Sequence, residues 1–372
     1  MRLRALATIG TTVLLATTGC AVTAKNDAGV STGSTTGGGS TTGGGSTTGA
    51  TTAPKIKDVV LVTHDSWNLP KKLVAQWEQQ TGYHLVVRAS GDAGRLTNKL
   101  VLTKGAPDGD VSFGVDNTFA TRALKAGVFA TYTPATVPAG VGQYDVEGDD
   151  GSHLTPIDHS DVCVNVDTTW FAAHKLPAPQ TLDDLVKPAY KGLFVTPGAS
   201  TSSPGMAFLL ATIAKYGDAW PDYWKKLMAN GAEITDGWDQ AYEVEFTQGG
   251  GNGKRPIVLS YDSDPAFTVK DGTTTTQALL DTCFTEVEYA GVLAGAKNVP
   301  GAEAFVDWLL SPQVQAKLPK SMYVFPVVAG TPLPADWATY AKEPTQPLTV
   351  SPAQIDANRE KWLQQWSDVT SR

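Results

Sequence analysis

The chain has 372 residues, of which 41% are hydrophobic, and its formal net charge at pH 7 is −8. An acidic exterior argues against binding to nucleic acid and against contact with anionic lipid beyond a covalent anchor. The length exceeds what one small hydrophobic core serves and favours two lobes.

The N-terminus has the pattern of an export signal. Arg2 and Arg4 precede an apolar run that is too short to span a membrane, and "TTGC" ends at Cys20. A Cys at the expected cleavage point resembles a bacterial lipoprotein signal, although Thr17 stands where Leu is usual. We expect residues 1–20 to be such a signal, with a lipidated Cys20 anchoring the protein to the outer face of the cell membrane. An ordinary signal peptide with a chance Cys is the alternative.

Residues 21–54 are predicted to be a disordered tether. The segment includes "STGSTTGGGSTTGGGSTTGATTA", in which almost no side chain could contribute to a core. About thirty such residues have an r.m.s. span of roughly 30 Å. An anchored domain on this tether could search the nearby membrane surface.

Residues 55–160 are expected to form the first part of lobe 1. Strands are predicted at 58–63, 84–89 and 110–116, and helices at 69–82, 94–105 and 117–127. This alternation predicts a parallel sheet with helices on its faces, and ligands of such sheets bind beyond the carboxyl ends of the strands. Asp65, Asp92 and Asp116 fall at those ends. Each could instead cap the helix that follows it.

Residues 161–284 are expected to form lobe 2, and residues 285–372 to return to lobe 1 and add C-terminal helices. The predicted strands are 162–167, 193–196 and 257–262, and the predicted helices are 181–192, 206–217, 301–318 and 351–369. At the last helix, Ser351 should cap the N-terminus, with Pro352 in the first turn and Gln354 completing a capping box.

The stretch "ITDGWDQAYEVEF", residues 234–246, carries two aromatic residues four positions apart. On a helix this spacing places Trp238 and Tyr242 on one face. The pair could be an ordinary core stripe or a platform for a bound ring, and the stretch by itself does not decide between them.

No catalytic motif is present. The sequence lacks HExxH, a CxxC pair and a GxSxG elbow, and its five His have no metal-ligand spacing. The segment "GGGNGKR" (249–255) departs from a phosphate-binding loop and is expected to be a hairpin or surface loop. The segment "DVEGDDGS" (145–152) departs from a calcium loop. We expect no enzymatic activity and no cofactor.

Cys163 and Cys283 are the remaining cysteines. Outside the cytoplasm, a disulfide between them is one possibility and two free thiols are the other.

Several segments resemble the solute-binding proteins of ABC importers. They are "LVKPAYKGLFVTPGASTSSPGMAFLL" and "AEAFVDWLLSPQVQAKLPKSMYVFPV". Shorter motifs follow the order seen in the thiamine-binding group of that family: "VTHDSW", "GDAGRLTNKL", "FGVDNTFA", "TDGWDQAY" and "VLSYDSDPAF". The resemblance covers about residues 57–372. It implies an α/β, two-lobed type II periplasmic-binding-protein fold with a ligand cleft between the lobes. It also implies thiamine as ligand, a monomer, and a permease and ATPase complex as partner.

Carried over by motif, the resemblance implies a set of ligand-binding residues. They are Asp65, Asp92, Ala93, Ser202, Ser203, Trp238, Tyr261, Asp262, Ser263, Asp264 and Tyr323. Trp238, Tyr261 and Tyr323 would form aromatic walls for flat rings and a fixed cation. Asp92 would meet a ligand amine or charge. Ser202 and Ser203 would hold the hydroxyl or phosphate tail.

The sequence departs from the family pattern at several of these positions. His64 and Ala93 replace an aromatic residue and a Gly, Tyr323 replaces Trp, and Asp264 replaces a small hydroxyl residue. The extra acid at 264 should disfavour phosphorylated thiamine.

Two alternative functions stay open. Ferric ion is the alternative ligand, with His64, Tyr261 and Asp264 as candidate ligands. A secreted hydrolase is the alternative class, with Ser202 or Ser203 as nucleophile and His64 or His159 as base.

Overall fold

The computed structural model describes residues 56–149 and 151–371. The predicted export signal, the predicted lipidation site Cys20 and the predicted tether therefore lie outside the described residues. Within them, no helix combines the length and the apolar character that crossing a bilayer would need.

A mixed sheet organises the fold, with strand order β2-β1-β3-β10-β4-β7-β5-β6 and β11 paired to β4. Its strands are β1 (Asp58–Thr63), β2 (His84–Ala89), β3 (Val111–Asp116), β4 (Thr155–Asp167), β5 (Phe194–Pro197), β6 (Glu233–Thr235), β7 (Ile257–Tyr261), β10 (Thr276–Val292) and β11 (Phe325–Pro326). A separate pair is formed by β8 (Val269–Lys270) and β9 (Thr273–Thr274). The predicted parallel pairing is confirmed for β1 with β2 and β3, and for β5 with β6 and β7.

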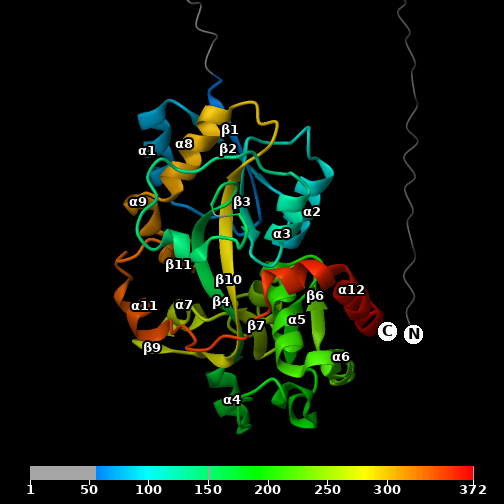
Figure 1. Ribbon diagram of the computed structural model, residues 1–372. Helices are drawn as coiled ribbons and strands as arrows, with labels where there is room; N and C mark the ends of the chain where they lie inside the picture. The colour runs from blue at the N-terminus through cyan, green and yellow to red at the C-terminus, as the bar shows by residue number, and fades with distance from the viewer. Residues whose placement is uncertain (1–55, 150, 372) are drawn as a thin grey trace, which may run out of the picture. The chain divides into compact units, whose positions relative to one another are not determined.

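Helices cover the sheet at both of its ends. They are α1 (Lys71–Thr81), α2 (Ala93–Leu102), α3 (Ala120–Lys125), α4 (Thr168–His174), α5 (Ser203–Tyr216), α6 (Trp220–Ala229), α7 (Asp264–Phe267), α8 (Val299–Leu309), α9 (Pro312–Gln315), α10 (Leu318–Ser321), α11 (Ala335–Tyr340) and α12 (Pro352–Thr370). Figure 1 shows α1, α2, α3 and α8 around β1–β3, and α4, α5 and α6 at the opposite end. The fold class is the expected two-lobed α/β arrangement.

Two long antiparallel strands connect the two halves of the sheet. Near Thr155, β4 pairs with the part of β10 that also pairs with β3. Near its other end, at Asp167, β4 lies beside β7. Figure 1 shows β4 and β10 running side by side between the two ends. Their pairing shifts register between Leu279 and Phe284. The sequence did not predict β10 as a continuous strand.

A disulfide joins these two strands at the register shift. Cys163 of β4 and Cys283 of β10 are bonded, are fully buried, and have Cα atoms 4.2 Å apart. Irregular pairing weakens a strand ladder locally, so a covalent link at this point compensates for the interrupted hydrogen bonds.

Each end of the sheet has its own aromatic packing. At one end Trp77 of α1 packs edge-on against Phe305 of α8, with ring centroids 5.6 Å apart. At the other end Trp224 of α6 packs edge-on against Phe208, and Trp366 of α12 lies 5.8 Å from Trp224. The helix α12 therefore packs against α6, in addition to its contact with α3. The lobe boundaries proposed from the sequence stay a prediction.

Some predicted helices are interrupted, and proline is the common reason. The helix expected at 301–318 is divided into α8 and α9, because Ser311 caps a new turn whose first residue is Pro312. The helix expected at 181–192 is two short 3-10 turns, the second starting at Pro188. The capping box at Ser351 and Gln354 is confirmed.

The disulfide gives a stability prediction. Replacing both Cys163 and Cys283 by Ala should lower the free energy of unfolding by about 2–5 kcal/mol, because the link constrains a long loop in the unfolded chain. Urea unfolding of the two proteins measures the difference. Reductant should bring the unsubstituted protein towards the variant, and equal midpoints under oxidising conditions would contradict the prediction.

Candidate functional site

A cavity of about 310 Å³ lies where the strand ends of the two halves meet. Its lining includes residues that follow β1, β2, β6 and β7, together with two side chains from β10. Of the residues implied by the resemblance, Asp65, Asp92, Ala93, Ser203, Trp238, Tyr261, Asp264 and Tyr323 line it. Ser202, Asp262 and Ser263 are not among its lining residues.

Trp238 forms one wall of the cavity. Its ring stacks on that of Tyr242, with centroids 5.0 Å apart and an interplanar angle of 12°. Its indole Nε1 donates to Ser260 Oγ at 2.9 Å. Tyr242 is only 2% exposed, so it lies behind Trp238 and supports it. The ring of Trp238 is the one that faces the cavity.

The stacked pair depends on a π-helical segment, Gln240–Glu245, rather than an α-helix. The Phe246 N–H donates to Ala241 O, five residues earlier. Wider turns of this kind are frequent at functional sites. The glycine loop that follows packs on the segment, and a Cβ at Gly249 would lie 1.7 Å from Tyr242 O. The glycines of "GGGNG" therefore allow close backbone packing. The loop packs against the π-helical segment, as a surface loop does, and is not arranged as a phosphate-binding loop.

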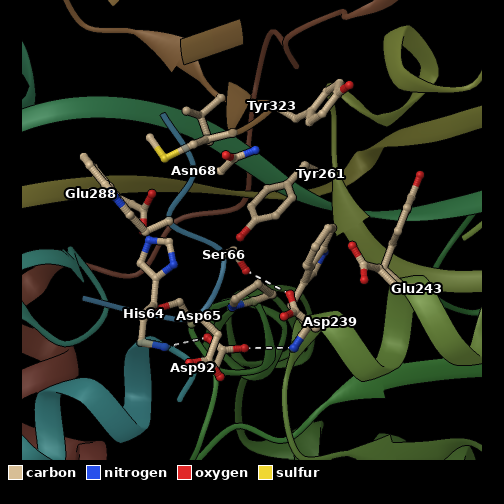
Figure 2. Close-up of a pocket in the computed structure, with 18 of the residues that line it drawn as sticks. His64, Asp65, Ser66, Asn68, Asp92, Asp239, Glu243, Tyr261, Glu288 and Tyr323 are labelled. Carbon is tan, nitrogen blue, oxygen red and sulfur yellow. Dashed lines mark hydrogen bonds and ion pairs between the residues drawn. The ribbon is translucent and has the colours of Figure 1, made fainter. Parts of the chain in front are cut away.

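Asp92 links the two halves of the sheet across the cavity. It precedes α2, and its Oδ1 accepts from Ala93 N at 2.6 Å. Its Oδ2 accepts from Trp238 N at 2.8 Å, from the other half of the sheet. Ser66 Oγ donates to Asp239 Oδ1 at 2.9 Å and makes a second link. Figure 2 shows both bonds as dashed lines. Asp92 therefore both caps α2 and holds Trp238 in place.

The two serines predicted to hold a ligand tail have other partners. Ser202 caps α5 and accepts from Gly205 N. Ser203 Oγ donates to Asp116 Oδ2, and burial raises the pKa of Asp116 to about 6. The two hydroxyls are used in packing α5 against the strand ends.

Tyr261 and Tyr323 provide the other aromatic surfaces. The Tyr261 hydroxyl donates to Glu286 Oε1 at 3.3 Å. Figure 2 shows Tyr261 extending into the cavity, with His64 and Glu288 on one side and Asp239 on the other. Tyr323 packs edge-on against Phe267 at 4.6 Å.

The backbone of Tyr323 is held in the left-handed region, with φ 58°. Non-glycine residues rarely adopt this conformation, and it persists where the surroundings fix it. Ser263 Oγ donates to Tyr323 O at 2.7 Å and provides one such restraint. Ser263 thus acts on the cavity through Tyr323.

Acidic side chains dominate the polar lining. Seven carboxylates reach the cavity, and His64 is the one basic side chain among the described residues that line it. The acids are Asp65, Asp92, Asp239, Glu243, Asp264, Glu286 and Glu288. Of these, Asp239, Glu243, Glu286 and Glu288 were not predicted.

The two glutamates of β10 are the most consequential of the missed residues. Glu286 and Glu288 are separated by Val287, so both point to the same face of the strand. Glu286 is 3% exposed and its Oε2 has no hydrogen-bond partner among the described residues. The alternation in "TEVEYA" was the available sequence signal, but using it required knowing which face of β10 lines the cavity.

His64 and Glu288 form an ion pair, with Nε2 and Oε1 3.1 Å apart. Burial works to lower the pKa of His64, but the nearby Glu288 carboxylate raises it on balance. Burial raises the pKa of Glu286 well above its usual range, and the nearby carboxylates of Asp116 and Glu288 add to the effect. A cation placed beside these carboxyl groups would favour their ionised forms.

The candidate nucleophile and bases of a hydrolase have other partners in the structure. Ser203 is bonded to Asp116, and the two candidate bases have other partners, His64 with Glu288 and His159 with Tyr144. Across residues 56–149 and 151–371, no group of three or more His, Cys, Asp or Glu side chains could hold a metal ion. What the site offers is aromatic surface facing buried carboxylates.

Comparison with known proteins decides the family. The sequence profile of the bacterial extracellular solute-binding proteins matches residues 110–351. The chain belongs to this family. The resemblance found in the sequence is thereby confirmed, and the protein is a binding component of transport, as its relatives are, and not an enzyme.

Individual relatives match over most of their length. The chain is 31% identical to the thiamine-binding periplasmic protein of Brucella suis, over 86% of this chain and 94% of the relative. It is 29% identical to that of Escherichia coli strain K12, over 86% and 96% respectively. A solved structure of a periplasmic thiamin binding protein superposes with a TM-score of 0.73 at 27% identity, covering 85% of this chain and 96% of the other.

The buried Asp264 gives a pH prediction. Burial raises the pKa of Asp264 from its ordinary 3.8 to about 7. Between about pH 4 and pH 7 the folded protein then holds a proton that the unfolded chain has released, so this group makes stability fall as pH rises. Asp264→Asn stays neutral. Its free energy of unfolding, relative to the unsubstituted protein, should therefore improve by about 3 kcal/mol between pH 4.5 and pH 8.

Urea unfolding at the two pH values measures this change. The exposed Asp218→Asn serves as the control and should shift little relative to the unsubstituted protein. Parallel pH profiles for Asp264→Asn and the unsubstituted protein would contradict the prediction.

Proposed function

We propose that this protein captures thiamine in the cavity between its lobes and delivers it to a membrane permease driven by a cytoplasmic ATPase. The observation that carries the proposal is the meeting of aromatic walls and buried, incompletely paired carboxylates in one cavity. The names of the relatives support the same ligand.

The chemistry of thiamine matches this lining. Thiamine carries a flat aminopyrimidine and a permanently cationic thiazolium. Trp238, Tyr261 and Tyr323 would contact the rings, since aromatic faces attract both flat rings and fixed cations. Glu286 and Asp264 each have a buried oxygen without a hydrogen-bond partner in the described part of the chain. A cation that cannot lose its charge would compensate them.

Binding would be coupled to closure of the cleft. Asp92 and Ser66 on one side bond to Trp238 and Asp239 on the other, so these contacts form only when the two halves approach. The hinge would lie in β4 and β10, the two strands shared by both halves. A closed form with the ligand inside is the species that we expect the permease to recognise.

We also propose that the protein acts as a monomer anchored by a lipid on Cys20. The support is the sequence: an export signal ends at this Cys and a long Gly, Ser and Thr segment follows. The anchor would keep the binding domain close to its permease, and the tether would let it turn and search.

Titration of the purified domain (residues 55–372) with thiamine tests the function. Binding should change Trp fluorescence and saturate at one thiamine per chain, and mass spectrometry should recover the thiamine unmodified. Ferric ion titrated in parallel should give no saturable change. Saturation by ferric ion alone, or recovery of a hydrolysed or phosphorylated product, would contradict the proposal.

Two variants locate the ligand in the cavity. Trp238→Ala removes a stacking face worth about 1–2 kcal/mol and should weaken thiamine binding about tenfold. Tyr242→Phe keeps the ring that supports Trp238 and loses only a buried hydroxyl without a hydrogen-bond partner among the described residues. It should stay within about twofold. Urea unfolding checks that the variants fold, and an unchanged affinity in folded Trp238→Ala would place the ligand elsewhere.

The anchor has a separate test. Cys20→Ala in the full chain should release the protein from the membrane fraction into the soluble or secreted fraction, because no other lipid attachment is proposed. Fractionation and immunoblotting measure the distribution. Cys163→Ala together with Cys283→Ala is the control for loss of cysteine itself and should stay with the membrane. Full retention of Cys20→Ala would remove the lipoprotein proposal.

A further inference from the structure

The glycine-rich loop contacts the π-helical segment Gln240–Glu245 at every second residue. We refer to residues 249–253 as the glycine ribbon. At three of its positions a Cβ would fall close to a backbone carbonyl: 1.7 Å from Tyr242 O at Gly249, 2.3 Å from Glu243 O at Gly251 and 2.2 Å from Glu245 O at Gly253. Non-bonded carbon atoms pack at about 3.5–4.0 Å. The ribbon and the segment therefore meet backbone to backbone, with no room for a side chain between them.

The position between the first two contacts needs glycine for a different reason. Gly250 has a φ of 89°, in the left-handed region, and no described atom lies within 4 Å of the place that its Cβ would take. Gly251 is not in that region, so an Ala there would keep the backbone conformation and only press on the segment. The two positions therefore separate backbone strain from contact with the segment.

Hydrogen bonds fix the N-terminal end of the ribbon. Thr247 Oγ1 donates to Asp167 Oδ2 at 2.6 Å, and Gln248 Nε2 donates to the same oxygen at 2.8 Å. Gln248 Oε1 accepts from Thr275 Oγ1 at 2.9 Å. Asp167 also caps α4, so this end of the ribbon is attached to structure outside the loop.

Arg255 fixes the other end of the ribbon. Its Nε donates to Glu233 Oε2 of β6 at 2.7 Å, and its Nη1 donates to Gly192 O at 2.8 Å. Its backbone N–H donates to Glu245 O at 3.0 Å. Because both ends are held, the ribbon cannot move away from the segment that it contacts. A side chain added to the ribbon would displace the segment instead.

A displacement of the segment would reach the cavity through Tyr242. The carbonyl of Tyr242 is the group that Gly249 contacts, and its ring stacks on that of Trp238 with centroids 5.0 Å apart. Asp92 holds the backbone N–H of Trp238, and Ser260 holds its indole nitrogen. These two bonds fix two points of the residue, so the tilt of the Trp238 ring depends on the ring behind it.

We propose that the glycine ribbon positions Trp238 for ligand binding. Held at both ends, it fixes the π-helical segment and thereby the plane of the ring on which a flat ligand stacks. Gly251 and Gly253 are not among the residues that line the cavity, so they act as positioning residues through Tyr242. The inference rests on the proposed function for the identity of the ligand, whereas the position of the ring can be measured without one.

Fluorine NMR of the protein labelled with 5-fluorotryptophan tests the position of the ring in the absence of ligand. Trp238→Phe identifies the Trp238 resonance by removing it. Gly251→Ala should move that resonance. Gly250→Ala strains the backbone but adds no contact, and it should leave the resonance in place. A resonance that stays in place in Gly251→Ala, or that moves equally in both variants, would overturn the proposal.

Calorimetric titration with thiamine measures the consequence for binding. Gly251→Ala should bind about fivefold more weakly than the unsubstituted protein, because a tilted ring loses part of the stacking contact. Gly250→Ala should stay within about twofold. A displaced resonance with unchanged affinity would overturn the role of the ribbon in binding. An unsubstituted protein that does not bind thiamine would contradict the proposed function, and the NMR result would still decide whether the ribbon positions Trp238.

Releasing one end of the ribbon tests the anchoring. Thr247→Val combined with Gln248→Ala removes both bonds to Asp167, so the ribbon could yield to an added side chain. In that background, Gly251→Ala should cost less than about twofold in affinity, and the difference from fivefold measures the coupling. The same fivefold cost would overturn the role of the anchor. Urea unfolding establishes which variants fold, and Gly253→Ala replaces Gly251→Ala if the latter does not.

Discussion

The antiparallel pairing of β4 with β10 is the constraint on which the other features depend. These two strands are the only ones in the described chain that are shared by both halves of the sheet, so they fix how the strand ends face each other. Glu286 and Glu288 reach the cavity because β10 passes between β3 and β4 at that point. The disulfide holds the same pair where its register shifts. A hinge in these strands would open the cavity without dismantling either half.

The cavity combines charge that is costly to bury with few groups to compensate it. Such an arrangement destabilises the empty protein and favours whatever supplies the missing positive charge. Stability in the absence of ligand and affinity in its presence are therefore two consequences of the same carboxylates. The aromatic walls add little charge of their own but orient a flat cation, and Trp238 does so because Tyr242, Ser260 and Asp92 fix its ring and backbone.

Motifs in the sequence were a good guide to the elements that surround the site and a weaker guide to what each side chain does. Trp238 and Tyr261 were expected at the cavity and lie there. Ser202 and Ser203 were expected to bind a ligand tail. Their hydroxyls instead bond within the protein, Ser202 at the start of α5 and Ser203 to Asp116. A motif identifies the position of a loop in the chain. The hydrogen-bond partner of a hydroxyl in that loop depends on which groups the tertiary packing brings near it. Glu286 and Glu288 were missed for the same reason.

The sequence by itself determined the family, the alternation of strands and helices, and the capping box at Ser351, because these depend on local periodicity and on short contiguous motifs. Tertiary structure alone decided the course of β10, the π-helical support under Trp238, and the gathering of seven carboxylates around one His. Those features join residues far apart in the chain, such as Asp92 with Trp238 and His64 with Glu288. Which distant groups meet is fixed by strand order and packing, and no local pattern records it.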